Sequence, residues 1–108
     1  MTLSEILKEK LEERFKYVTY LNHLNEERKK IVLKFDKEYL VLYNRVQNTV
    51  GYSFYAIRRA VNESSKINKY RKEISDNTEK RKETIKKIKT LKTEIKVLND
   101  TNSKLNNK

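Results

Sequence analysis

The chain has 108 residues, one glycine, no proline and no cysteine, and 38% of its residues are charged. Sheet proteins and loop-rich enzymes need glycine and proline at their turns, so this composition favours long, uninterrupted helices. The lack of cysteine excludes disulfides and thiolate metal sites, and the net charge of +11 favours an acidic partner.

The first predicted element is a helix within residues 1–50, which are nearly neutral and rich in aromatic residues. Thr2 and Glu5 have the spacing of a capping box at its start. Apolar residues then recur at helical spacing, and after residue 30 they nearly encircle the helix. A helix that is apolar on most sides must be covered from more than one direction. Residues 31–57 are therefore the predicted core.

A turn and a short helix are predicted for residues 51–65. Gly51 is the better candidate for the turn, because glycine readily adopts the left-handed conformation that ends many helices. The polar run 62–65 is the second candidate, since such side chains cap helices or compete with them. Both positions are compatible with the sequence.

The last predicted element is a basic coiled-coil helix over residues 66–108. Its apolar positions alternate in spacing between three and four, with Ile at a, Leu at d and one Asn at an a position. This predicted seam consists of Ile88, Leu91, Ile95, Leu98, Asn102 and Leu105. The fold that follows is all-α, an elongated helical hairpin with a C-terminal coiled-coil segment. Its arms, residues 3–48 and 53–106, would each be roughly 70–80 Å long if straight.

No set of residues has the spacing of a catalytic or metal site. The single histidine, His23, has only Glu27 one helical turn away, and one such pair is typical of a solvated surface. The chain contains no glycine-rich phosphate loop and no nucleophile motif. We therefore expect no enzyme activity, no cofactor and no metal.

The apolar positions are better suited to holding a partner. Phe35, Tyr39 and Tyr43 lie four residues apart on one helical stripe. One interpretation is a platform on which bases stack. We favour an interface whose tyrosines keep their hydroxyls in water, because known stacking platforms lie mostly on sheets. The predicted partner interface is Phe35, Tyr39, Leu42, Val46, Ile88, Leu91, Ile95, Leu98 and Leu105.

Positive charge is concentrated in residues 51–108, which hold sixteen of the 26 basic residues and seven of the 15 acidic ones. A basic helix can follow phosphates or face an acidic protein. The predicted contacts to nucleic acid or to an acidic partner are Arg58, Arg59, Arg71, Lys72, Arg81, Lys82, Lys86 and Lys87. Lys87 and Lys92 flank the seam and would meet their own copies in a parallel homodimer, so parallel self-pairing is disfavoured and an acidic, helical partner is favoured.

These patterns predict a non-enzymatic coiled-coil assembly or adaptor subunit that docks through the Ile/Leu seam and the basic helix. The alternatives are a small basic nucleic-acid-binding protein and an inhibitor that occludes a charged site of another protein. The first residues do not resemble a signal peptide, and the longest apolar run, residues 39–43, is too short to span a bilayer. We expect an intracellular location, cytoplasmic or nuclear, or a place within a virion.

Overall fold

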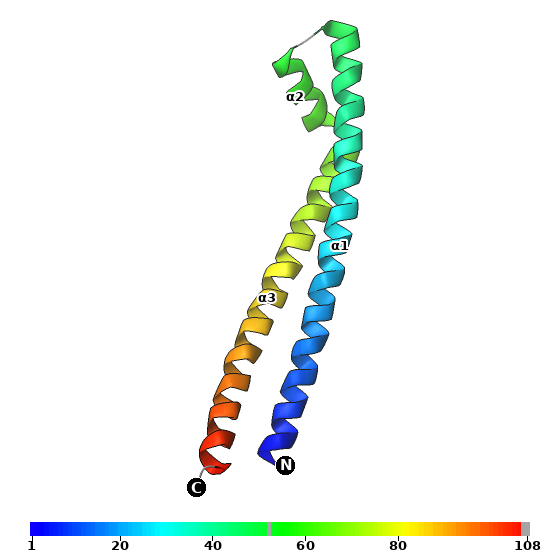
Figure 1. Cartoon of the computed structure of the whole chain (residues 1–108). Coiled ribbons are helices and arrows are strands. Elements are labelled where there is room, and N and C mark those ends of the chain that lie inside the picture. The colour runs from blue at the N-terminus through cyan, green and yellow to red at the C-terminus, as the bar shows by residue number, and fades with distance from the viewer. Residues whose placement is uncertain (52, 107–108) are drawn as a thin grey trace. The chain divides into compact units, whose positions relative to one another are not determined.

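A computed structural model of the chain describes residues 1–51 and 53–106, and within them every regular element is a helix. The helices are α1 (Leu3–Val50), α2 (Phe54–Glu63) and α3 (Ser65–Asn106). Figure 1 shows the long α1 followed in the chain by the short α2 and the long α3. The predicted all-α helical hairpin is confirmed. Tyr52 and residues 107–108, which fall within the predicted second and third segments, lie outside the described residues.

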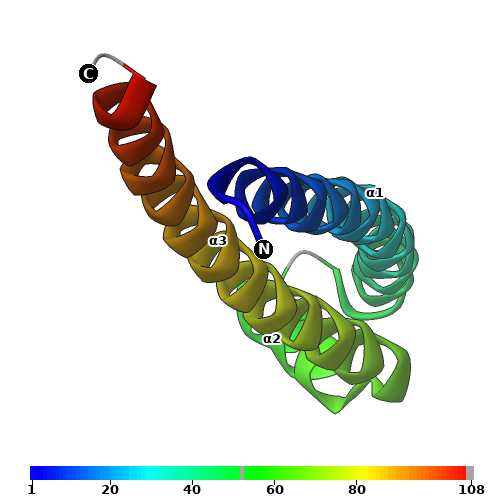
Figure 2. The same ribbon diagram turned by 90° about the horizontal axis from the view of Figure 1, so that it is seen from below.

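The hairpin consists of two compact units. The first unit combines Met1–Leu24 with Lys80–Lys108, and the second unit is Asn25–Glu79. The two ends of the sequence therefore share the first unit. In the second unit, α2 and the first turns of α3 lie along the same side of α1 (Figures 1 and 2).

Both positions that the sequence offered for a turn interrupt the helices. At Gly51 the φ angle is 78°, in the left-handed region, and its N–H donates to the Gln47 carbonyl oxygen over 3.0 Å. Glycine is favoured there because a side chain would clash with the neighbouring carbonyl. Ser53 then begins α2, since its hydroxyl oxygen accepts a hydrogen bond from the Ala56 N–H.

Ser64 separates α2 from α3. Its ψ angle of 120° is extended, which ends α2, and its hydroxyl oxygen accepts from the Ile67 N–H over 3.3 Å. The same serine therefore terminates one helix and caps the next.

The apolar core of the second unit lies where all three helices meet. Leu42 of α1, Ile57 and Val61 of α2 and Ile67 of α3 are buried together. Phe35, Tyr43 and Val46 pack against them. As the encircling pattern predicted, α1 is covered here by two other helices, although Leu33, Leu40 and Val41 stay exposed on its outer side.

Burial along both long helices follows a heptad pattern. In α3 every position from Ile67 to Asn102, taken at alternating steps of three and four, is buried or half-buried. The pattern includes Asn77 and Thr84, which are both buried. In α1 the corresponding buried or half-buried positions are Leu3, Leu7, Lys10, Tyr17, Leu21, Leu24, Arg28, Ile31, Phe35, Glu38 and Leu42. The stripe of α3 is therefore part apolar and part polar, and that of α1 is interrupted at Arg14, the heptad position between Lys10 and Tyr17, which is exposed.

None of the described helices combines the length and the apolar character that crossing a membrane would require.

Candidate partner-binding site

The residues predicted to form a partner interface are divided between the two units. Phe35, Tyr39, Leu42 and Val46 lie in the second unit, whereas Ile88, Leu91, Ile95, Leu98 and Leu105 lie in the first. Leu42 and Leu91 are buried within the chain, and most of the others are half-buried. Only Tyr39 and Leu105 are exposed. The contact of these residues with a partner stays a prediction.

The predicted basic contacts are divided in the same way. Arg58, Arg59, Arg71 and Lys72 belong to the second unit, and Arg81, Lys82, Lys86 and Lys87 belong to the first. All are exposed except Arg81, which is half-buried. The ammonium of Lys87 lies 5.3 Å from the centre of the Tyr17 ring, a cation–π distance.

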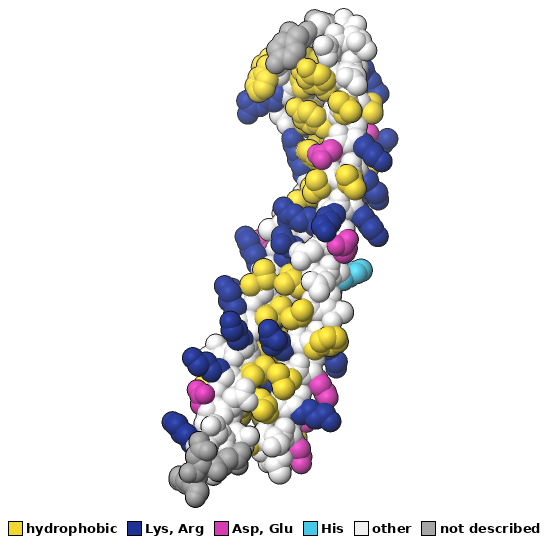
Figure 3. Space-filling view, viewed as in Figure 1, with side chains coloured by type: hydrophobic (Ala, Val, Ile, Leu, Met, Phe, Trp, Pro, Cys, Tyr) yellow, Lys and Arg dark blue, Asp and Glu magenta, His cyan; other side chains and the backbone are white. Residues whose placement is uncertain are grey.

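The outward side of α2 carries two large aromatic residues beside two arginines. Ile57 and Val61 are the buried residues of this short helix, whereas its aromatic and arginine side chains are exposed. Phe54 and Tyr55 are 71% and 76% exposed. We define the α2 face as Phe54, Tyr55, Arg58, Arg59 and Asn62. Figure 3 shows hydrophobic side chains gathered over this part of the second unit, with Lys and Arg side chains at their edge.

A hollow of about 310 Å³ opens beside the α2 face. All three helices contribute to it, and its lining is Tyr39, Phe54, Ile57, Arg58, Val61, Asn62 and Arg71. We call this the α2 hollow. Arg71 Nη1 donates to Asn62 Oδ1 over 3.1 Å, and Asn68 Nδ2 donates to the Asn62 carbonyl oxygen over 3.0 Å. These two bonds connect the end of α2 to α3 and fix one side of the hollow.

Two positive charges line the α2 hollow without a carboxylate partner among the described residues. Arg59, on the neighbouring side of α2, pairs with Glu63 through Nε and Oε1 at 3.1 Å. Arg71 bonds the neutral amide of Asn62, and Arg58 takes part in no ion pair within residues 1–51 and 53–106. The hollow therefore has the chemistry to bind an anion next to an apolar group.

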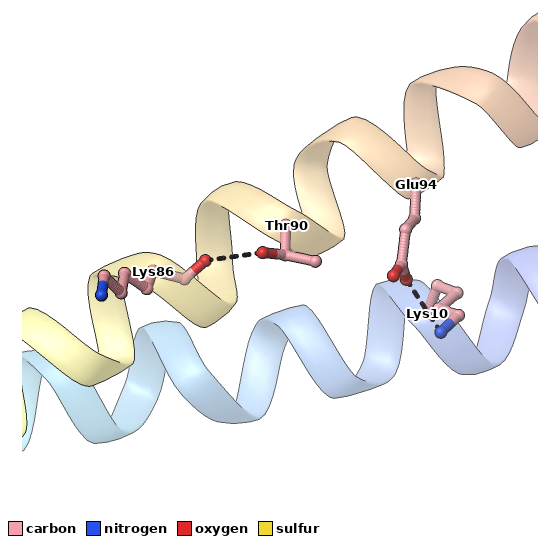
Figure 4. A network of polar contacts seen from close by, with 4 residues as sticks. All are labelled: Lys10, Lys86, Thr90 and Glu94. Atoms are coloured by element: carbon pink, nitrogen blue, oxygen red, sulfur yellow. Dashed lines mark hydrogen bonds and ion pairs between the residues drawn. The ribbon is translucent and has the colours of Figure 1, made fainter.

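A second hollow, of about 250 Å³, lies in the first unit, and its lining includes three lysines and two glutamates. Lys10 Nζ lies 2.8 Å from Glu94 Oε2, and the two side chains point toward each other (Figure 4). Hydrogen bonding to Glu94 and then its charge raise the pKa of Lys10 above the ordinary 10.5. This pair holds α1 to α3 and is structural.

Sequence reasoning named Tyr39, Arg58 and Arg71 of the α2 hollow as site residues, but not Phe54 or Asn62. Phe54 precedes Arg58 by four residues, and Tyr55 precedes Arg59 by four. That spacing was the available signal that each aromatic residue lies one helical turn from an arginine. Asn62 was missed because its role depends on α3 folding back beside α2.

No three His, Asp or Glu side chains of the described residues lie close enough together to hold a metal ion. His23 is exposed on α1. Comparisons with protein-family models, with curated proteins and with solved structures gave no match for this chain.

Proposed function

We propose that this chain is a non-enzymatic adaptor subunit and that it binds a partner protein through the α2 face. The observation that carries the proposal is the exposure of Phe54 and Tyr55, each more than two-thirds accessible and each one turn from an arginine. Aromatic residues and arginine are enriched at protein interfaces, where they supply most of the binding energy. An exposed pair of such residues on a short helix supports a docking role.

The burial of the predicted seam favours the α2 face over the seam as the docking surface. A partner that contacted Leu42 or Leu91 would first have to separate the arms that bury them. Exposing a buried leucine costs about 1.5–3 kcal/mol, and several would be exposed together. A partner on the α2 face meets side chains that are already accessible.

Nucleic-acid binding is the second candidate function, and a lysine stripe in the first unit supports it. Lys82, Lys86, Lys89 and Lys96 are exposed on α3, and their spacing of four, three and seven residues places them on one side of the helix. Such a row can follow a phosphate backbone. It has no exposed aromatic residue among its members, which makes it less specific than the α2 face.

Affinity purification of the full chain, with and without nuclease, tests the two candidates. We expect a protein partner that is retained after nuclease treatment and is lost from the double variant Phe54→Ala, Tyr55→Ala. The matched control is Leu33→Ala, Leu40→Ala, which removes two side chains that are 60% and 59% exposed elsewhere in the second unit. Release of the partner by nuclease, or equal loss in both double variants, would contradict the adaptor proposal.

A further inference from the structure

We propose that the α2 hollow binds an acidic side chain of a partner helix, with an apolar residue of the same helix packed against the hollow's base. This inference rests on the proposed adaptor function, since it names the chemistry that the partner must offer to the same surface. The determining residues are Arg58 and Arg71 for the acid, and Ile57 and Val61 for the apolar residue.

The apolar part of the hollow suits one aliphatic or aromatic side chain. Ile57 and Val61 are the buried residues that form its base, and the exposed Tyr39 and Phe54 complete its apolar lining. A volume of about 310 Å³ is at the lower end of the range for ligand pockets, which is roughly 300–1,000 Å³. It accommodates a side chain or two, which is what an amphipathic helix lays into a groove.

The charged part of the hollow suits a single carboxylate. Guanidinium groups bind carboxylates with two parallel hydrogen bonds, and they do so best when they are already held in place. Arg71 is held by Asn62 Oδ1 at 3.1 Å, and the Asn62 carbonyl is itself bonded by Asn68. Arg58 comes from α2 and faces the same space. A carboxylate between the two would neutralise charges that the described residues leave without an acidic partner.

Glu63 favours a partner with an isolated acid over a continuous polyanion. It pairs with Arg59 at 3.1 Å and lines a neighbouring hollow together with Tyr55 and Arg58. A phosphate backbone running along α2 would bring further negative charges toward this carboxylate, and their repulsion would offset part of its attraction to the arginines. A helix that presents one Asp or Glu next to an apolar residue, three or four positions apart, avoids that repulsion.

Selection from a phage-displayed library of random peptides on the immobilised full chain tests this inference. We expect the selected peptides to carry Asp or Glu three or four residues from a Leu, Phe or Ile. Replacing that acid by its amide should weaken binding about tenfold or more. Arg58→Gln and Arg71→Gln should each weaken binding by a similar factor.

Lys72→Gln is the matched control, because Lys72 is exposed beside Arg71 and the change removes the same charge outside the hollow. Its affinity for the selected peptides should stay within about twofold. Circular dichroism of all three variants verifies that the helices are retained. The inference is wrong if no acidic peptide is enriched, if the arginine variants bind like the control, or if mixed-sequence single-stranded DNA binds the hollow more tightly than the selected peptides.

The outcome is separable from that of the proposed function. Loss of the natural partner from Phe54→Ala, Tyr55→Ala combined with normal binding by the arginine variants would leave the adaptor role intact and refute the acidic-helix site. The opposite result is also possible. If the aromatic variant retains the natural partner and acidic peptides bind in an arginine-dependent way, the acidic-helix site would be supported and the proposed adaptor function of the α2 face refuted.

Discussion

Replacing Ile67 by alanine should destabilise the fold far more than an apolar truncation on the outer side of α1. Ile67 is 0% exposed and packs with Leu42, Ile57 and Val61. The change removes three carbon groups at about 0.8 kcal/mol each, or roughly 2.4 kcal/mol in lost transfer free energy. The remaining cavity adds to this, so the free energy of unfolding should fall by about 2–5 kcal/mol.

Leu40→Ala is the control for this prediction. Leu40 is 59% exposed, so its truncation should cost less than about 1 kcal/mol, and alanine's better helix propensity offsets part of that cost. Urea unfolding followed by far-UV circular dichroism measures both variants. The midpoint of Ile67→Ala should fall by about 1 M or more, whereas that of Leu40→Ala should barely move. Equal shifts in the two variants would refute the three-helix core.

Three further predictions concern the turn, the ion pair and the polar seam. Gly51→Ala should cost about 1–2 kcal/mol of stability in urea, because the φ of 78° is unfavourable for alanine. Apart from Gly51 itself and its two chain neighbours, no described atom would lie within 4 Å of the new Cβ, so the backbone conformation alone sets this cost. Gly51→Asn should cost less, and equal losses would contradict the backbone explanation. The pKa of Lys10 is raised by Glu94 in the folded chain. The stability that this ion pair contributes is therefore fully present below the ordinary lysine pKa of 10.5, and it is lost as the pH rises through the pKa that Lys10 has in the folded chain. The urea midpoint should therefore fall more steeply at alkaline pH in the unmodified chain than in Glu94→Gln, and parallel curves would exclude the pair. Asn77 is 1% exposed at a seam position, so Asn77→Leu should raise the urea midpoint and broaden the oligomer distribution in light scattering, whereas a lower midpoint would show that the polar contacts of Asn77 stabilise the fold.

The helical content and the hairpin could be predicted because local signals and global pattern agree. Thr2 caps α1 as its spacing with Glu5 indicated, the Glu5 N–H donating to the Thr2 hydroxyl oxygen over 3.2 Å. Gly51, the single glycine of the chain, occupies the one left-handed position among the described residues. Such features depend on a few neighbouring residues, so sequence alone can reveal them.

The stripe that α1 presents to α3 was harder to predict, because charged side chains occupy part of it. Following only apolar residues leads to Leu11 and Phe15, which are exposed. The heptad instead passes through Lys10, which pairs with Glu94, and through Arg28, whose Nη1 donates to Thr78 Oγ1 over 2.8 Å. Long basic side chains can cover apolar surface with their stems while their charged ends find partners. Those partners lie on the other arm, which local periodicity cannot reveal.

The residue types of the candidate site could be predicted from the sequence, but the proximity of its residues in space could not. Arg58 and Arg71 are visible as basic residues in the sequence, but thirteen positions separate them. They line one hollow because Ser64 interrupts the helix between them and changes the direction of the chain. The position of that break was predictable, whereas the angle it introduces depends on how Ile57, Val61 and Ile67 pack.

The second unit is inserted in the sequence between the two segments of the first unit, and this order affects how the chain folds. The second unit, Asn25–Glu79, is contiguous, whereas the first joins the two ends of the sequence. Closing a longer loop costs more entropy, and folding slows as contacts become more distant in sequence. We therefore expect the second unit to fold first and the first unit to fold after it, starting from the residues next to the second unit. Once it has formed, the flanking segments of α1 and α3 are already held near each other, and pairs such as Lys10 and Glu94 can close with little further loss of chain entropy. Substitutions around Ile67 should then slow folding, whereas substitutions around Leu91 should mainly accelerate unfolding.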